Sequence, residues 1–234
     1  MLDSFLSAVH HFTGLKIRRG ARHPLDPLAL VWSPVVGILA VILTVSFYIP
    51  LAAFYLPSDV AVIPAFVAIC LVRGFKPEID FCRLCDSFPG RKKGLSRRSA
   101  TGVPGVTFLV FAALLKYAIA RQFFLLESVK LLGFGTFVTF VVPLLEPKRA
   151  SWILFLGGSW LLVSAIAAFS PLKTNSFAAL LLSLRAPFVA VALIYLCVRL
   201  TFQFADEPAP LNVAALPAEL AAYLSFMLAR YHFL

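Results

Sequence analysis

Charged residues are scarce in this chain of 234 residues. Only 14% of the residues are charged, against 61% that are hydrophobic, whereas soluble domains carry about a quarter charged residues. A water-soluble fold of this size has too much surface for so few charges to cover. The shortage therefore argues against an ordinary soluble domain and indicates that much of the exterior faces lipid.

Motifs that would identify a soluble enzyme or a secreted protein are also missing. The sequence contains no phosphate-cradling glycine loop, no zinc-protease helix and no serine-nucleophile elbow. Its four cysteines form no secretory disulfide framework, and the CxxC of Cys82 and Cys85 lacks the further ligands that zinc requires. No basic start followed by an apolar run and a cleavage site is present, so we expect no removable signal peptide.

Long apolar runs make up most of the chain. They cover about residues 28–49, 59–72, 105–126, 128–145, 151–170, 176–200 and 214–229. Crossing the hydrocarbon core takes roughly 20 residues, and most runs approach that length. Arg185 and Pro187 interrupt the run 176–200, which suggests a broken helix. We predict an all-α, polytopic transmembrane helical bundle of about six or seven spans, built as a single domain over residues 1–234.

Residues 1–27 are predicted to form an amphipathic N-terminal segment. Apolar side chains recur at helical spacing from Leu2 to Phe12, and basic residues follow at Lys16, Arg18 and Arg19. This pattern is typical of a short helix that lies on the membrane surface with basic anchors. The alternative is a frayed soluble tail.

The net charge of +10 is concentrated in a few segments. Seven spans with the N-terminus inside would put 15 of the 21 Lys and Arg residues on the cytoplasmic side, eight of them in the segment 73–104. The distribution of Lys and Arg sets the orientation of membrane proteins. We therefore expect a protein of the cell inner membrane, with its N-terminus and a long basic loop at 73–104 in the cytoplasm. The basic balance then indicates anionic headgroups or phosphorylated substrates as partners rather than nucleic acid.

Acidic residues are few, and three of the eleven lie close together in the predicted loop. These are Glu78, Asp80 and Asp86, and they are flanked by the basic residues Arg73, Lys76, Arg83 and Arg91. Carboxylates in such a cluster are able to hold Mg²⁺ that bridges to a diphosphate, while the cations neutralise the remaining oxygens. The alternative is a solvated loop whose acids offset the nearby bases.

Two cations fall inside predicted spans. Charges in the bilayer are costly, so Lys116 and Arg185 are expected to face a cavity or a partner, or else to snorkel toward an interface. Glu219 lies at the start of the last apolar run. It is a candidate partner for either cation, or a helix N-terminal charge that the macrodipole favours.

In layout and local motifs the chain resembles the cobalamin synthase family, adenosylcobinamide-GDP ribazoletransferase. The phrases that carry the resemblance are HFTGLKI at His11–Ile17, SPVVGILA at Ser33–Ala40, LVRGFKPEIDFCRLCDSF at Leu71–Phe88, RRSATGVPGV at Arg97–Val106, LLKYAIA at Leu114–Ala120 and PAPLNVAALPAEL at Pro208–Leu220. They cover nearly the whole chain and match the family more in order and spacing than in identity.

The resemblance implies a membrane transferase that joins adenosylcobinamide-GDP to α-ribazole or its 5′-phosphate with release of GMP, and that uses Mg²⁺. The family's three loop aspartates fall on Ile79, Arg83 and Asp86, while Lys116 and Glu219 match family positions. The implied metal ligands are Asp86, Asp80 and Glu78; the implied catalytic residues are Asp86, Asp80 and Lys116; the implied substrate-binding residues are Arg73, Lys76, Arg83, Arg91 and Glu219.

A second hypothesis stays open, because only Asp86 of the three loop aspartates is kept. Arg83 in place of an aspartate reverses the local charge and tends to repel a metal ion, although a guanidinium is able to bind phosphate oxygens directly. The chain is then a catalytically degenerate membrane relative that binds a corrinoid, or a partner such as another corrinoid-assembly enzyme, through its basic loop. A small transporter is less favoured, because the sequence shows no internal repeat and no paired broken helices.

Overall fold

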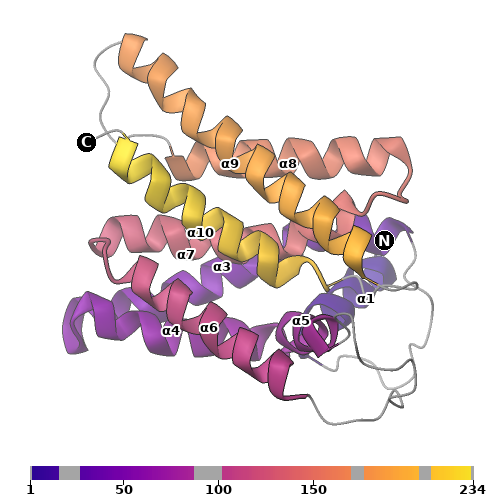
Figure 1. Cartoon of the computed structure of the whole chain (residues 1–234), viewed down its shortest axis with the longest axis horizontal. Helices are drawn as coiled ribbons and strands as arrows, with labels where there is room; N and C mark the ends of the chain where they lie inside the picture. Colours follow the sequence, from indigo (N-terminus) through magenta and orange to yellow (C-terminus); the bar gives the residue numbers. More distant parts are fainter. Residues whose placement is uncertain (1, 16–26, 87–101, 170–176, 206–211, 233–234) are drawn as a thin grey trace.

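The computed structural model describes residues 2–15, 27–86, 102–169, 177–205 and 212–232. All regular elements in these ranges are helices, which confirms the all-α prediction (Figure 1). They are α1 (Leu2–Phe12), α2 (Pro27–Val31), α3 (Ser33–Pro50), the π-helical turn η1 (Leu51–Tyr55), α4 (Ser58–Val72), α5 (Lys76–Asp86), α6 (Val103–Ala120), α7 (Leu125–Val141), the 3₁₀ turn η2 (Val142–Leu145), α8 (Ser151–Phe169), α9 (Phe177–Phe204) and α10 (Ala215–His232).

Five helical segments in the described ranges are long and apolar enough to cross a membrane. They are Pro27–Tyr55, Val103–Ala120, Leu125–Leu145, Ser151–Phe169 and Arg185–Phe204. α4 and α5 pass the same test only together, and the chain bends by 86° between them. The count in these ranges is thus five, or six with the bent pair, so only the larger count reaches the predicted six or seven. The seventh predicted span is missing because α10 is not among them.

Large apolar side chains are exposed along the outer helices. Examples are Phe54 of η1 at 79% exposure, Phe155 of α8 at 78% and Phe111 of α6 at 71%. Soluble monomers rarely expose extended apolar surface of this kind. The surface is that of a multi-pass membrane protein, whose exterior contacts lipid.

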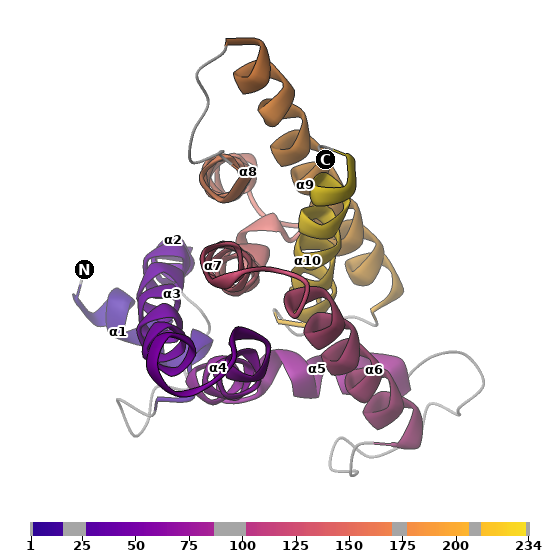
Figure 2. The ribbon, with the colours of Figure 1, turned by 90° about the vertical axis from the view of Figure 1, so that its left-hand side faces the viewer.

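α7 lies at the centre of the bundle, against α3, α8 and α10 (Figure 2). Small residues allow the close approach: a Cβ at Gly37 of α3 would lie 2.9 Å from the Cβ of Phe140 of α7. Gly135 of α7 likewise lies directly against the ring of Tyr223 of α10. Small residues at helix contacts are the usual means of tight packing in membrane bundles.

Two expectations about element boundaries were wrong. Residues 73–104 are not one loop, because Lys76–Asp86 form α5, whose packed face includes Pro77, Cys82 and Cys85. The run 176–200 is not broken either, because α9 continues through the buried Pro187 as one helix. Membrane helices tolerate proline when neighbouring groups satisfy the freed backbone carbonyl.

α1, α5 and the first turn of α6 lie at one end of the bundle, and the last turn of α10 lies at the other (Figure 1). At this second end Arg230 of α10 donates to the carbonyl of Gln122 and pairs with Glu127 at 3.5 Å. The first end, which holds α5 and its acidic residues, contains the candidate site.

Candidate functional site

The site is built around the corner between α4 and α5. Gly74, with φ +62°, ends α4 in the left-handed conformation, and Phe75 follows with φ +56°. The N–H of Phe75 donates to the carbonyl of Cys70 at 2.9 Å and that of Gly74 to the carbonyl of Leu71 at 3.0 Å. This pair of bonds is a Schellman motif, which stops a helix and redirects the chain. The turn sets α5 nearly perpendicular to α4 and directs Arg73 into the bundle.

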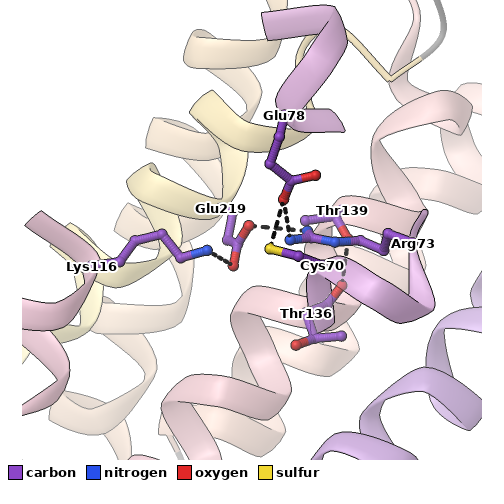
Figure 3. A network of polar contacts seen from close by, with 7 residues as sticks. All are labelled: Cys70, Arg73, Glu78, Lys116, Thr136, Thr139 and Glu219. Carbon is purple, nitrogen blue, oxygen red and sulfur yellow. Dashed lines mark hydrogen bonds and ion pairs between the residues drawn. The ribbon is translucent and has the colours of Figure 1, made fainter. Parts of the chain in front are cut away.

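Four buried charged side chains meet inside this corner (Figure 3). Arg73 donates from Nη2 to Oε1 of Glu78 at 2.8 Å and from Nη1 to Oε2 of Glu219 at 3.0 Å. Nζ of Lys116 lies 2.6 Å from Oε1 of Glu219. We call these four residues the buried quartet. It joins the α4–α5 corner to α6 and α10, which are far apart in the sequence.

The surroundings of Lys116 are aromatic. Its ammonium lies 4.9 Å from the ring centroid of Phe66 and 5.7 Å from that of Tyr223. Such contacts between a cation and an aromatic ring are worth about 2 kcal/mol or more when desolvated. Lys116 is therefore held by one carboxylate and two rings rather than by water, and the snorkelling alternative is wrong.

The quartet is electrically balanced, with two cations and two carboxylates. The side chains of Arg73, Glu78, Lys116 and Glu219 are between 0% and 7% exposed. A buried charge without a partner is very costly, whereas a closed set of pairs offsets most of the desolvation penalty. Cys70 adds one contact, because its Sγ–H donates to Oε1 of Glu78 at 3.3 Å.

Lys76 holds α1 against the same corner. Its ammonium donates to the carbonyls of His10, His11 and Thr13 at 2.9, 2.7 and 2.8 Å. An ammonium has three N–H groups, so these three bonds occupy all of them, and no N–H remains for the phosphate that the sequence analysis assigned to Lys76. The predicted N-terminal helix is present, and its buried Ala8 and Phe12 pack in a cluster with α2 and α3.

The three carboxylates of the predicted magnesium site have separate partners. Glu78 belongs to the quartet, and Asp80 lies 3.6 Å from the largely exposed Arg83. Asp86 accepts from the backbone N–H groups of Gly102 and Gly105, at 2.5 and 2.9 Å. Gly102 is the N-cap residue of α6, and Asp86 of α5 caps the start of that helix from outside by accepting from N–H groups that have no partner within the helix.

These side chains do not fit a shared magnesium ion in this arrangement. In the described part of the chain, no three His, Cys, Asp or Glu side chains are grouped as a metal site requires. One oxygen of Glu78, Oε2, has no hydrogen-bond partner among the described groups, but Glu78 belongs to no group of three such side chains within these ranges. Because Mg²⁺ needs several oxygen ligands in near-octahedral geometry, its binding stays a prediction.

The remaining predicted residues lie apart from the quartet. Arg83 is on the outer side of α5 with its side chain 65% exposed, and Arg185 is exposed on α9. Arg91 lies outside the described residues. Cys82 and Cys85 are buried free thiols, and Cys82 donates to the carbonyl of Gly105 at 3.3 Å. The pair packs α5 against α6.

Sequence reasoning identified all four members of the quartet but only part of its pairing. Glu219 was expected to partner Lys116 or Arg185, and the structure selects Lys116. The contacts of Arg73 with Glu78 and Glu219 were missed, because Arg73 was expected to bind phosphate. Its position directly after an apolar run and before a glycine was the available signal for a buried helix end.

Comparison with known proteins identifies no relative. No family model, no curated protein and no solved structure matches this chain. The resemblance to the cobalamin synthase family therefore stays a prediction, and the function is argued from the geometry.

Proposed function

We propose that this chain is a multi-pass protein of the cell inner membrane that binds a phosphate-bearing corrinoid of the adenosylcobinamide-GDP type. In this proposal it does not carry out magnesium-dependent transfer. The observation that carries the proposal is the use of the acidic residues: each carboxylate that would serve a metal is engaged by a group of the chain itself.

The first support is that segments which resemble the family come together in space. The segment 71–88 supplies Arg73 and Glu78, the segment 114–120 supplies Lys116, and the segment 208–220 supplies Glu219, all in one buried quartet. A fourth segment, 97–106, meets the first through the bonds from Gly102 and Gly105 to Asp86. Family motifs that are distant in sequence are expected to converge in this way when they form one site.

The second support is the chemistry of that convergence. Catalysis of phosphoryl transfer rests on positioning and on stabilisation of charge at the transferring group, usually with metal ions. Here Glu78 and Glu219 neutralise Arg73 and Lys116, and Asp86 caps α6. Binding of a phosphate-bearing ligand by the basic residues that follow α5 in the sequence, among them Arg91, needs no metal ligand.

The distribution of charge supports a cytoplasmic position for this end. α1, α5 and the turn from α7 to α8, which carries Lys148 and Arg149, lie at the same end of the bundle (Figure 1). Basic residues are enriched on the cytoplasmic side of membrane proteins. In the proposal this end faces the cytoplasm, where nucleotide-linked intermediates and other corrinoid-assembly enzymes are available as partners.

The test is a binding titration with the whole protein in lipid nanodiscs. Adenosylcobinamide-GDP is titrated with Mg²⁺ and with EDTA, and adenosylcobinamide without its nucleotide serves as the control ligand. We expect saturable binding of the nucleotide-linked compound that is unchanged by EDTA, and no GMP release when α-ribazole is added. Absence of binding by correctly folded protein would refute the proposal.

A second candidate is the transferase itself. The observation in its favour is the 2.6 Å contact between Lys116 and Glu219, since both occupy positions that match family motifs. Magnesium-dependent release of GMP, lost in Asp86→Ala and Asp80→Ala, would establish this candidate. Complementation of a strain that lacks cobalamin synthase gives the same answer in the cell: rescue supports the transferase, and failure of a well-expressed chain supports the binding protein.

A further inference from the structure

We infer that α5 lies flat in the headgroup region of the bilayer and that its outer stripe, formed by Ile79 and Arg83 together with Phe75 of the turn before it, is a lipid-binding surface. The partner is the phospholipid interface, with anionic lipid phosphates at Arg83. This inference concerns the outer side of α5 and does not depend on the ligand proposed for the protein.

The orientation of α5 follows from the corner that precedes it. α4 runs along the bundle with the other long helices, and α5 is bent away from it by 86° (Figure 1). Because α4 runs along the bundle beside the membrane-spanning helices, α5 runs nearly parallel to the membrane surface. Helices in this position bury an apolar face at the boundary between headgroups and acyl chains.

The composition of the two faces of α5 fits this position. Its inner face carries Glu78 and Cys82, both buried against the bundle. On the outer side, Ile79 is 42% exposed and the side chain of Arg83, four residues later, is 65% exposed, and Phe75 of the preceding turn is 43% exposed. Two large apolar side chains followed by a long cation is the pattern of a helix that rests on lipid.

The depth of α5 is set by its neighbours at both ends. On the α4 side, Leu71 is 60% exposed, only two residues before Arg73. On the α6 side, Gly105 packs against the backbone of Cys82, and the flanking Val103 and Val106 are 78% and 46% exposed. Exposed apolar residues of α4 and α6 therefore lie on both sides of α5, at about the same depth in the bundle. This continuity with the lipid-facing surfaces of α4 and α6 favours lipid over water as the medium around α5.

Arg83 supplies the electrostatic part of the surface. Asp80, with 14% of its side chain exposed, lies 3.6 Å from it, and solvent screens the pair because the Arg83 side chain is 65% exposed. A guanidinium binds a phosphate through two parallel N–H bonds, so the N–H groups of Arg83 that do not face Asp80 are able to bind a lipid phosphate. Long cations near helix ends reach the interface in this manner.

The experiment measures the depth of the stripe in liposomes of phosphatidylcholine and phosphatidylglycerol. Ile79→Trp and Phe75→Trp are compared with the parent chain. The lipid-facing control is Val67→Trp, because Val67 of α4 is 51% exposed. The measured quantity is the fluorescence that each new tryptophan adds. Three quenchers are compared: lipids brominated near the headgroup, lipids brominated near the chain end, and aqueous iodide. We expect positions 79 and 75 to lose most of their added signal to the headgroup-proximal bromines, and position 67 to the deeper ones.

Other outcomes overturn the inference. Strong iodide quenching with no effect of brominated lipid would place the stripe in water, and resistance to every quencher would show that protein, such as a second copy of the chain, covers it. The phosphate contact is tested separately by counting the phosphatidylglycerol molecules retained in native mass spectrometry. The Arg83→Gln variant should retain fewer phosphatidylglycerol molecules than the parent chain, and Arg83→Lys should retain most of them. The control is Arg121→Gln, which replaces an exposed arginine at the other end of the bundle. Equal retention in all three variants would refute the role of Arg83.

Discussion

Replacement of Glu219 by glutamine tests whether the buried quartet stabilises the fold. Glu219 has 0% side-chain exposure and contacts both cations, Lys116 at 2.6 Å and Arg73 at 3.0 Å. Glutamine keeps the shape and removes the charge, so Arg73 keeps one carboxylate, Glu78, and Lys116 loses the carboxylate that it contacts. Removal of one partner from a buried pair costs about 3–5 kcal/mol, and the double contact puts Glu219→Gln near the upper end. For a chain of this size the loss corresponds to a fall in Tm of roughly 10–20 °C.

The assay is reversible unfolding in mixed micelles, followed by tryptophan fluorescence, with the thermal midpoint as a second measurement. The matched control is Glu127→Gln. Glu127 is also paired with an arginine, Arg230 at 3.5 Å, but its side chain is 47% exposed, and exposed pairs contribute about 0–1 kcal/mol. Equal effects of the two substitutions would show that burial is not the deciding property.

A double variant separates charge from packing. Glu219→Gln combined with Lys116→Met leaves Arg73 with Glu78, so the charge balance is restored. The loss in the double variant should be clearly smaller than the sum of the two single losses, since side chains in one network are not additive. Simple additivity would refute the account of the quartet as a coupled set.

Three further substitutions test the elements around the site. Gly74→Ala should lower the free energy of unfolding by about 1–2 kcal/mol for the positive φ alone and by more in total, because its Cβ would lie 2.6 Å from the Cα of Gly14. Gly158→Ala, inside α8 with open space around the new methyl, is the control in the same unfolding assay and should raise the free energy of unfolding by up to about 1 kcal/mol, because alanine favours a helix over glycine. Lys76→Met should release the end of α1, which limited proteolysis would detect as faster cleavage near Thr13, whereas unchanged cleavage would contradict the anchoring role. Asp86→Ala should lower the free energy of unfolding by about 0.5–2 kcal/mol through loss of the α6 cap, and Asp86→Asn should lower it by less. If removal of Mg²⁺ destabilised the parent chain more than the Asp86→Ala variant, a metal site at Asp86 would be indicated instead.

The long apolar helices were predictable, since length and hydropathy alone determine which segments cross a membrane. α5 was not predictable in this way. Five of its eleven residues are charged, and its helix depends on tertiary contacts: Glu78 pairs with Arg73, and Cys82 packs against Gly105. Without knowledge of these contacts, a segment rich in charge next to a glycine reads as a loop.

The site residues could be selected from the sequence but not paired. A charge inside an apolar run signals a partner, which was enough to single out Lys116 and Glu219. Which charges meet depends on where the chain turns, and the turn at Gly74 reverses the expected role of two residues. It directs Arg73 inward to the carboxylates and leaves the amine of Lys76 facing the carbonyls of α1.

The pairing of Lys116 with Glu219 has a consequence for the order in which the protein is made. The two residues are separated by most of the second half of the chain, so α6 is made before its counter-charge has been translated. Lys116 lies four residues before the end of α6 at Ala120, and a cation within a membrane helix costs up to about 2.5–3.5 kcal/mol on insertion scales. We therefore expect newly made α6 to insert stably only after the final helix has emerged, and chains that stop short of Glu219 to be degraded faster than the full chain.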